Sequence, residues 1–272
     1  MAPALQATIG GATRLIGIVG DPIAQVKSPG SWNPRLAAAG RDAVLVPIEV
    51  PAAEFESTIA AIMRIANLDG LVFTMPFKER IIPHLAAISR RATEVGAVNA
   101  ARRGPDGTWV GDMFDGLGLV GAVRGLGLDP KGLRAGLVGA GGAGSAIAYA
   151  LAEAGVASLR IVDAAPDRAA RLADGVSRAA RRPGGPVATA AAALDLGALD
   201  LLVNASPVGM AEGDGTPLDV GGLTPATSVV DIVTRPGTAL IAAAAAAGCR
   251  HAGGAAMVAA QTEAMLAFFE LA

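Results

Sequence analysis

The sequence predicts an α/β fold in two domains with parallel sheets. Short runs rich in Val, Ile and Leu alternate with alanine-rich stretches of helical length, which is typical of βα units. The chain has 272 residues, whereas one domain usually takes about 150. A glycine motif at residues 139–144 follows one aliphatic run and opens a helical stretch, as in nucleotide-binding βαβ units.

The individual elements follow from these patterns in chain order. Strands are expected at residues 15–19, 43–48, 70–74, 137–138 with their neighbours, 159–163, 201–204 and 229–232. Helices are expected at residues 29–39, 52–65, 145–154, 165–180 and 238–247. Residues 97–112 predict a hairpin, because Asp106-Gly107 lies between two extended segments. The Arg-Arg-Pro-Gly-Gly-Pro stretch at 181–186 predicts a surface loop.

Composition excludes several classes of function. A net charge of −2 argues against a broad nucleic-acid surface, which would need clustered Lys and Arg. The single cysteine, Cys249, excludes an intramolecular disulfide. The two histidines, His84 and His251, stand in no spaced cluster, so no metal site is expected. No apolar run nears the roughly 18 residues of a membrane span, and no secretion signal is apparent. We therefore expect a cytoplasmic protein with no nucleic-acid or membrane partner.

The glycine motif is the strongest chemical signal. It runs through Gly139, Ala140, Gly141, Gly142, Ala143 and Gly144. Glycines permit a tight turn and let the backbone approach a pyrophosphate at the helix N-terminus. A flexible turn is the alternative for such a motif alone. Its place between a strand and a helix favours dinucleotide binding.

The next predicted strand ends in Asp163, about 20 residues beyond the motif. An acidic residue there accepts hydrogen bonds from the ribose 2′-hydroxyl and repels a 2′-phosphate. The sequence therefore favours NAD, although Arg168 close by leaves NADP open.

A second group of polar residues lies in the N-terminal half. Thr74 and Lys78 follow a predicted strand that Pro76 ends, and Asp115 follows the predicted hairpin. A lysine and an aspartate in one cleft can exchange a proton with a substrate hydroxyl. Spacing alone does not distinguish such a pair from two solvated charges.

A series of short motifs then decides between these interpretations. In chain order they read GDPIAQVKSP, TMPFKE, GAVNA, FDGLG, GAGGAG, NASPVGM, DIVTRPGTALIAAAAAAG and GGAAMVAAQ. In this order, and nearly end to end, the chain resembles the shikimate/quinate dehydrogenase family. The resemblance implies an N-terminal α/β substrate domain at residues 1–115, completed by the C-terminal helix at 253–272. A Rossmann dinucleotide-binding domain at 116–252 would be inserted between these parts, with a cleft between the domains.

The resemblance also implies roles for individual residues. Lys78 and Asp115 match the catalytic proton-exchanging pair. Thr74, Asn99 and Gln261 match residues that hold the ring hydroxyls, and Ser28 matches one of two hydroxyl residues that hold the substrate carboxylate. The positions that line the cofactor cleft are Ser206, Met210, Val233 and Gly254.

Some positions depart from the family pattern and make the expected pocket less polar. Val26 replaces the first carboxylate-binding serine, and Thr234 replaces a tyrosine that assists it. The others are Val72 for asparagine, Ala100 for threonine, and Met113-Phe114 for Asn-Thr. Each lost hydrogen bond to a charged group costs about 1.5–3 kcal/mol. Lys27 would compensate only if it faced the pocket, and a solvated surface lysine is the alternative.

We therefore expect a metal-independent, NAD(P)-dependent dehydrogenase that interconverts a secondary alcohol and a ketone on a cyclic hydroxy acid, such as shikimate or quinate. A family member acting on a less polar cyclic substrate is one alternative. A non-catalytic NAD(H)-binding regulator is another, although such a protein would not need both Lys78 and Asp115. The expected assembly is a monomer or a homodimer.

Overall fold

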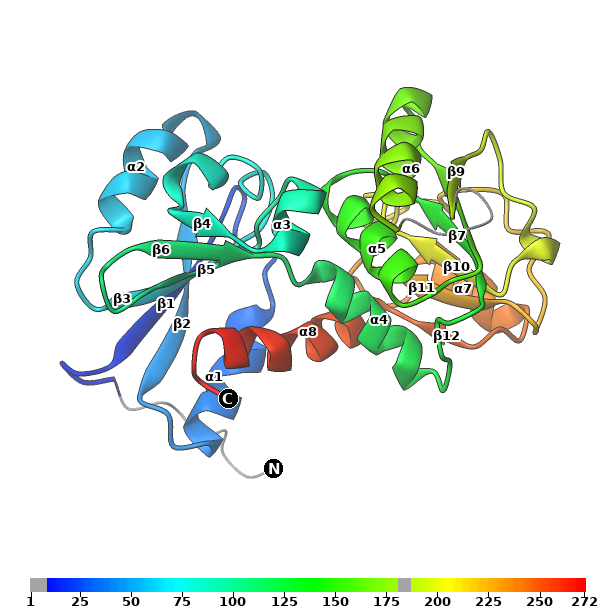
Figure 1. Ribbon diagram of the computed structural model, residues 1–272. Helices are drawn as coiled ribbons and strands as arrows, with labels where there is room; N and C mark the ends of the chain where they lie inside the picture. Colours follow the sequence, from blue (N-terminus) through cyan, green and yellow to red (C-terminus); the bar gives the residue numbers. More distant parts are fainter. Residues whose placement is uncertain (1–8, 181–186) are drawn as a thin grey trace, which may run out of the picture. The chain divides into compact units, whose positions relative to one another are not determined.

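The computed structural model describes residues 9–180 and 187–272 (Figure 1). They form two compact units. The first unit comprises the described residues up to Phe114 together with Thr262–Ala272, and the second comprises the described residues of Asp115–Gln261. The loop predicted at 181–186 lies outside the described residues. In the described ranges, no helix has the length and apolar character needed to cross a membrane.

The first unit contains a mixed sheet in the order β2-β1-β3-β5-β6-β4. Its strands are β1 (Arg14–Gly20), β2 (Ala43–Glu49), β3 (Leu68–Phe73), β4 (Ala87–Ile88), β5 (Ala100–Arg103) and β6 (Trp109–Asp112). β1 runs parallel to β2 and β3, whereas β5 is antiparallel to both β3 and β6. The hairpin predicted at residues 97–112 is confirmed as β5 and β6. Because the hairpin reverses the chain, this sheet is mixed rather than purely parallel.

The helices of this unit are α1 (Ser28–Ala38), α2 (Phe55–Ile62) and the short α3 (Arg90–Val95), and residues 52–54 form a 3₁₀ turn ahead of α2. The hydrophobic pattern of the sequence did not predict α3. Its signals are present, however, because Ser89 accepts a hydrogen bond from the N–H of Ala92 and Gly96 ends the helix in the left-handed conformation. A serine before and a glycine after a short stretch are ordinary cap signals.

The second unit contains an all-parallel sheet in the order β12-β11-β10-β7-β8-β9. Its strands are β7 (Arg134–Val138), β8 (Ser158–Val162), β9 (Ala188–Ala190), β10 (Leu201–Asn204), β11 (Ser228–Asp231) and β12 (His251–Ala252). The first strand, β7, lies in the middle of the sheet. β8 and β9 extend the sheet to one edge, and β10, β11 and β12 extend it from β7 to the opposite edge. This is the Rossmann order, and its topological switch point lies between β7 and β10.

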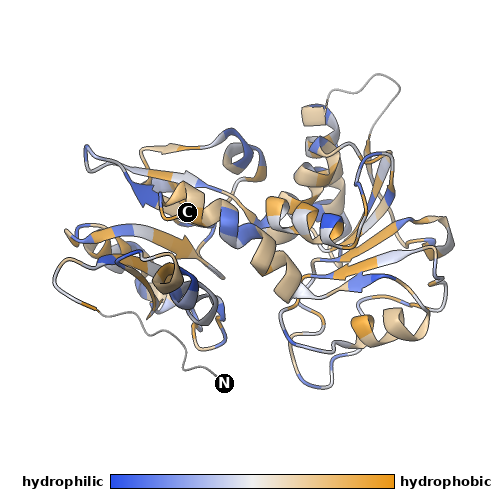
Figure 2. Ribbon diagram, turned by 90° about the horizontal axis from the view of Figure 1, so that it is seen from below, coloured by the Kyte–Doolittle hydropathy of each residue, from blue (hydrophilic) through white to orange (hydrophobic). Residues whose placement is uncertain are grey.

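Four helices accompany this sheet, and a fifth is shared with the first unit. They are α4 (Asp115–Gly125), α5 (Gly142–Glu153), α6 (Pro166–Ala180), α7 (Ala239–Ala246) and the shared α8 (Gly254–Phe268). Every residue of β10 and β11 is buried, and hydrophobic residues prevail along the inner strands (Figure 2). Such continuous apolar strands are expected of a parallel sheet covered on both faces.

The two units divide α8 between them. The sequence analysis assigned residues 253–272 to the first domain, whereas the structure groups the residues up to Gln261 with the second unit. Met257 belongs to the core of the second unit, where its carbonyl oxygen would lie 2.8 Å from a Cβ at Gly118 of α4. Met265 and Phe269, in contrast, belong to the core built around β1 and α1. One helix therefore supplies apolar side chains to two cores.

Candidate active site

The loops that follow β1 and β3 lie side by side at the carboxyl edge of the first sheet. The N–H of Thr74 donates to the carbonyl oxygen of Val19 at 3.0 Å, and the N–H of Asp21 donates to that of Met75 at 3.1 Å. Ligands of open α/β sheets bind outside this edge. The structure therefore places Thr74 at the edge where a substrate would bind.

Lys78 is held by its backbone in the same region. Its carbonyl oxygen accepts a hydrogen bond from the N–H of Val98 at 2.8 Å. The preceding residue, Phe77, is fully buried and stacks on Phe55 with ring centroids 4.2 Å apart. The Lys78 side chain itself is half-buried. These contacts fix where the lysine emerges and join its loop to the segment that carries Asn99.

Asn99 is buried, with 2% of its surface exposed, and lies just before β5. Its N–H donates to the carbonyl oxygen of Asp112 at 3.0 Å, and its own carbonyl oxygen accepts from the N–H of Phe73 at 2.9 Å. Its side-chain Oδ1 accepts from the N–H of Phe114 at 2.9 Å. Because the amide is planar, this bond also sets the direction of the Nδ2 group, which is a hydrogen-bond donor.

The segment that leads into Ser28 combines exposed polar residues with one apolar side chain that packs inward. Ser28 is half-buried at the start of α1, and Lys27 beside it is exposed. Val26 packs against a buried cluster that includes Val72 and Phe114. These residues were noted separately in the sequence as departures from the family pattern. In the structure they belong to one apolar cluster, which also contains Ala100.

In the second unit, the glycine motif forms the turn between β7 and α5. Gly139 has a φ of +101°, which only glycine adopts easily. A Cβ at Gly144 would lie 2.0 Å from the carbonyl oxygen of Gly139, whereas a Cβ at Gly142 would meet nothing within 4 Å. The turn therefore has no room for a side chain at Gly144 but has room for one at Gly142. Gly141 caps α5 without a side-chain hydrogen bond, so the turn suits a pyrophosphate at the helix N-terminus.

Asp163 follows β8 and faces this turn. Its carboxylate accepts hydrogen bonds from the N–H groups of Ala140 at 2.7 Å and Ala165 at 2.8 Å. Burial alone would raise the pKa of Asp163, but these two bonds and the charge of Arg168 outweigh it and lower the pKa. A Cβ at Gly141 would lie 3.9 Å from the guanidinium of Arg168. The negatively charged Asp163 and the positively charged Arg168 therefore both lie beside the turn where an adenosine ribose is expected.

A buried polar network supports the loops after β10 and β11. Asp231 is fully buried and accepts hydrogen bonds from Asn204 Nδ2 at 2.9 Å, Thr238 Oγ1 at 2.6 Å and the N–H of Val233 at 3.1 Å. Asn204 Oδ1 in turn accepts from the N–H and the hydroxyl of Ser206. The sequence analysis named Ser206 and Val233 but missed the residues that hold them. Thr238 carried a signal, because it caps α7.

The remaining predicted cofactor positions lie nearby in the same unit. The N–H of Gly254 donates to the carbonyl oxygen of Val233 at 3.2 Å. A Cβ at Gly254 would lie 2.3 Å from the carbonyl oxygen of Ile232, so only glycine fits this crossing. Met210 is exposed, with 48% of its surface accessible.

Asp115 and Gln261 both belong to the second unit. Asp115 is the first residue of α4 and is buried, with 4% of its surface exposed. Gln261 packs beside α4, since its Cβ would lie 3.0 Å from a Cβ at Gly118. Its buried Oε1 has no hydrogen-bond partner among the residues that the structure describes. A buried acceptor without a partner is costly, and a substrate hydroxyl would satisfy it.

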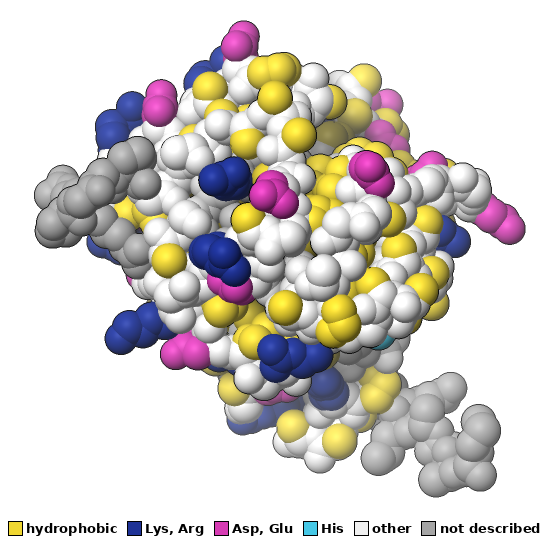
Figure 3. All heavy atoms as spheres, turned by 90° about the vertical axis from the view of Figure 1, so that its right-hand side faces the viewer, with side chains coloured by type: hydrophobic (Ala, Val, Ile, Leu, Met, Phe, Trp, Pro, Cys, Tyr) yellow, Lys and Arg dark blue, Asp and Glu magenta, His cyan; other side chains and the backbone are white. Residues whose placement is uncertain are grey.

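Within the described ranges, no group of three or more His, Cys, Asp and Glu side chains could hold a metal ion. On the face drawn in Figure 3, basic and acidic side chains are interspersed rather than gathered by sign.

Comparison with known proteins identifies the family. Residues 18–101 match the model of the shikimate dehydrogenase substrate binding domain. The shikimate dehydrogenase (NADP(+)) of Rubrobacter xylanophilus is 38% identical over 242 residues, which cover 87% of this chain and 83% of that protein. The chain belongs to the shikimate dehydrogenase family.

Solved structures of related proteins match both units. The quinate dehydrogenase of Corynebacterium glutamicum in complex with NAD has a TM-score of 0.84 at 30% identity, covering 94% of this chain and 93% of that chain. The ligand-free 5-ketofructose reductase of Gluconobacter sp. strain CHM43 has a TM-score of 0.84 at 26% identity, covering 96% and 94%. The family fold therefore extends over nearly the whole chain.

Proposed function

We propose that the protein is an NAD(P)-dependent dehydrogenase that interconverts a secondary alcohol and a ketone on a cyclic hydroxy acid of the shikimate or quinate type. Its membership of the shikimate dehydrogenase family, at 38% identity over 87% of the chain, carries this proposal. The first unit would bind the substrate and the second the cofactor. We expect a monomer or a homodimer, which sedimentation would distinguish.

In the proposed mechanism, a nicotinamide cofactor would be held by the glycine turn at 139–144 and would supply or accept the hydride. Lys78 donates a proton to the carbonyl oxygen in one direction and accepts it from the hydroxyl in the other. Asp115 is the second member of the proposed proton-exchanging pair. Asn99 Nδ2 donates to a ring oxygen, because its Oδ1 is bonded to the N–H of Phe114. Gln261 Oε1 accepts from a ring hydroxyl, which gives this buried atom its partner.

The proposal is tested by following NAD⁺ and NADP⁺ reduction with shikimate, quinate and a panel of cyclic alcohols. Turnover of a hydroxy acid supports it. Tight NADH binding without turnover of any panel member would instead support the non-catalytic regulator.

The apolar cluster favours a second candidate, a dehydrogenase of the same family with a less polar substrate. Val26 and Val72 offer no hydrogen bond to a carboxylate, and both pack in the cluster that contains Phe114. A structural relative is named 5-ketofructose reductase, and 5-ketofructose carries no carboxylate. The family fold is thus found in a protein named for an uncharged substrate.

The variant Val26→Ser distinguishes these candidates. If the substrate carboxylate lies beside residue 26, the new hydroxyl should raise kcat/KM for shikimate by about tenfold or more, since such a bond is worth about 1.5–3 kcal/mol. A cyclic alcohol without a carboxylate should show no gain. Val26→Ala is the matched control, because it shortens the side chain without adding a donor. Equal kinetics of the serine and alanine variants would mean that residue 26 does not contact the carboxylate.

Cofactor choice gives another prediction. Asp163 should make NAD the preferred cofactor, because its carboxylate repels a 2′-phosphate. Asp163→Asn should shift the ratio of kcat/KM values toward NADP by about tenfold, and Arg168→Ala should shift it toward NAD, since one unit of charge near a phosphate is worth about 1–3 kcal/mol. The ratio is measured with both cofactors at a saturating substrate concentration. A parent enzyme that clearly prefers NADP would contradict the role given to Asp163.

A further inference from the structure

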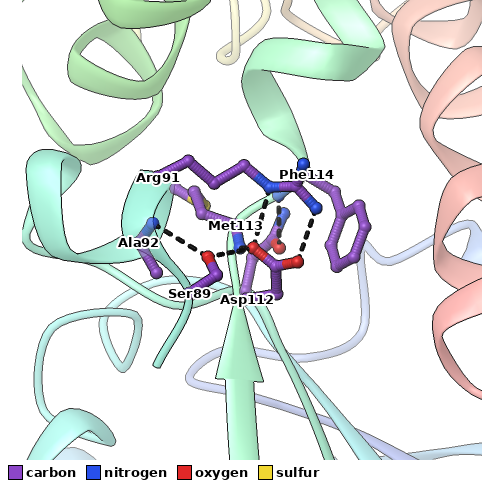
Figure 4. Close-up of polar contacts among 7 residues, drawn as sticks. Ser89, Arg91, Ala92, Asp112, Met113 and Phe114 are labelled. Carbon is purple, nitrogen blue, oxygen red and sulfur yellow. Dashed lines mark hydrogen bonds and ion pairs between the residues drawn. The ribbon is translucent and has the colours of Figure 1, made fainter. Parts of the chain in front are cut away.

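Donors from three residues, Ser89 and Arg91 at the start of α3 and Met113 next in the chain, converge on the carboxylate of Asp112 at the end of β6 (Figure 4). Arg91 donates through Nε at 2.8 Å and through Nη2, the hydroxyl of Ser89 donates, and the N–H of Met113 donates at 2.7 Å. Only 11% of the Asp112 side chain is exposed. A carboxylate removed from water is stable only when it is paired and hydrogen-bonded, so this arrangement holds the end of β6 firmly to α3.

Arg91 makes a second contact with the same segment. Its guanidinium carbon lies 4.8 Å from the centroid of the Phe114 ring, within the range of a cation–π interaction. The ring also contacts Phe268 of α8, with centroids 5.4 Å apart. Arg91 therefore binds the side chains on both sides of Met113.

The segment held in this way carries groups assigned to the active site. The carbonyl oxygen of Asp112 accepts from the N–H of Asn99 at 3.0 Å, and the N–H of Phe114 donates to Asn99 Oδ1 at 2.9 Å. The next residue along the chain is Asp115, which begins α4. A shift of residues 112–114 would therefore turn the Asn99 amide.

We infer that Arg91 and Asp112 are positioning residues for the proposed reaction. Their ion pair holds Phe114 so that its N–H sets the orientation of the Asn99 amide, which donates to the substrate in the proposed mechanism. This inference rests on the proposed function, because Asn99 and Asp115 act on a substrate only in that reaction.

The arrangement requires an arginine. A planar guanidinium can donate two bonds to one carboxylate and still lie against a ring, whereas the ammonium of lysine is a single point of charge. Asp112 likewise needs its charge, since an asparagine would present an N–H₂ group to donors. Ser89 adds a third connection, because its hydroxyl also accepts from the N–H of Ala92 and caps α3.

Steady-state kinetics of Arg91→Lys and Asp112→Asn test the inference. Each variant should lower kcat by about 10- to 100-fold, because small displacements of reacting groups cost that much. The KM for the cofactor should stay within about twofold, since the glycine turn lies in the other unit. Arg90→Lys is the matched control: its side chain is 80% exposed and is paired with Glu94, and its kinetics should equal those of the parent.

A double variant separates positioning from independent effects. Arg91→Lys combined with Asp112→Asn should be no slower than Asp112→Asn alone, because both changes break one ion pair. Thermal unfolding of each variant sets an assay temperature at which it is fully folded. If kcat recovers there to within about twofold of the parent, Arg91 and Asp112 serve stability alone and the inference is wrong.

Hydrogen exchange of the Met113 and Phe114 amides tests the arrangement without any substrate. Both should exchange at least about tenfold faster in Asp112→Asn than in the parent, and unchanged exchange would overturn the inference. A parent protein without turnover would refute the proposed function. The exchange measurement would still test whether the Arg91–Asp112 pair holds residues 113 and 114, because it needs no substrate. The two failures are therefore distinguishable.

Discussion

Replacing Lys78 with alanine is expected to lower kcat by about 10²- to 10⁴-fold, which is the usual contribution of a positioned proton donor. The loss should occur without unfolding. The backbone of Lys78 keeps its bond from the N–H of Val98, and its neighbour Phe77 keeps its stacking on Phe55. Because the glycine turn lies in the other unit, NADH affinity should be unchanged.

The measurement combines steady-state kinetics with NADH fluorescence titration. Lys131→Ala is the control, because this lysine is exposed, lies in the chain between α4 and β7, and has no assigned role in the reaction. An active Lys78→Ala enzyme would refute the proton relay. Loss of activity together with loss of NADH binding would assign Lys78 to the cofactor instead.

Replacing Gly144 with alanine should abolish cofactor binding at ordinary concentrations. The new Cβ would lie 2.0 Å from the carbonyl oxygen of Gly139, and a backbone oxygen cannot turn away as a side chain can. The end of β7 and the start of α5 would have to separate, which would remove the N–H groups that face the pyrophosphate. We expect NADH affinity to fall by about 100-fold or more, and the free energy of unfolding to fall by about 1–3 kcal/mol.

Gly142→Ala provides the matched stability control, because it adds the same methyl group in the same turn. A Cβ there meets nothing within 4 Å, so alanine should leave the free energy of unfolding unchanged or slightly raise it. Chemical denaturation of both variants makes the comparison. Equal stability of the two would contradict the close approach of Gly144 to Gly139.

Much of the fold could be predicted from local patterns. The aliphatic run at residues 201–204 is β10 with the predicted bounds, and the glycine motif lies between β7 and α5 as expected. Asp106-Gly107 correctly placed the hairpin of β5 and β6. These predictions succeed because hydrophobic periodicity and turn residues act over a few neighbouring positions.

The candidate site was harder to predict from the residues. Lys78 and Asp115 were identified through the family resemblance, since two charges at that spacing are ordinary on a surface. Arg91 and Asp112 were missed, although they form the main ion pair beside Asn99. Their pairing depends on α3 packing against the end of β6, which no local pattern reveals.

The division of α8 was also outside the reach of the sequence. Its alanine-rich residues show no strongly one-sided apolar face, so the pattern does not say which core each half joins. Met257 joins the core of the second unit, and Phe269, just beyond the helix, joins that of the first. Only packing in three dimensions makes that choice.

The sequence by itself determined the βα order, the glycine turn and the family, because these depend on short motifs and on the conformations that each residue allows. The tertiary structure decided which distant side chains meet. It joined Arg91 to Asp112 and Asn204 to Asp231, and it gathered Val26, Val72 and Phe114 into one apolar cluster. The physical reason is that these pairings depend on burial, which exists only once the chain has folded. A buried polar group is stable only with a hydrogen-bond partner, and apolar groups gain by leaving water together.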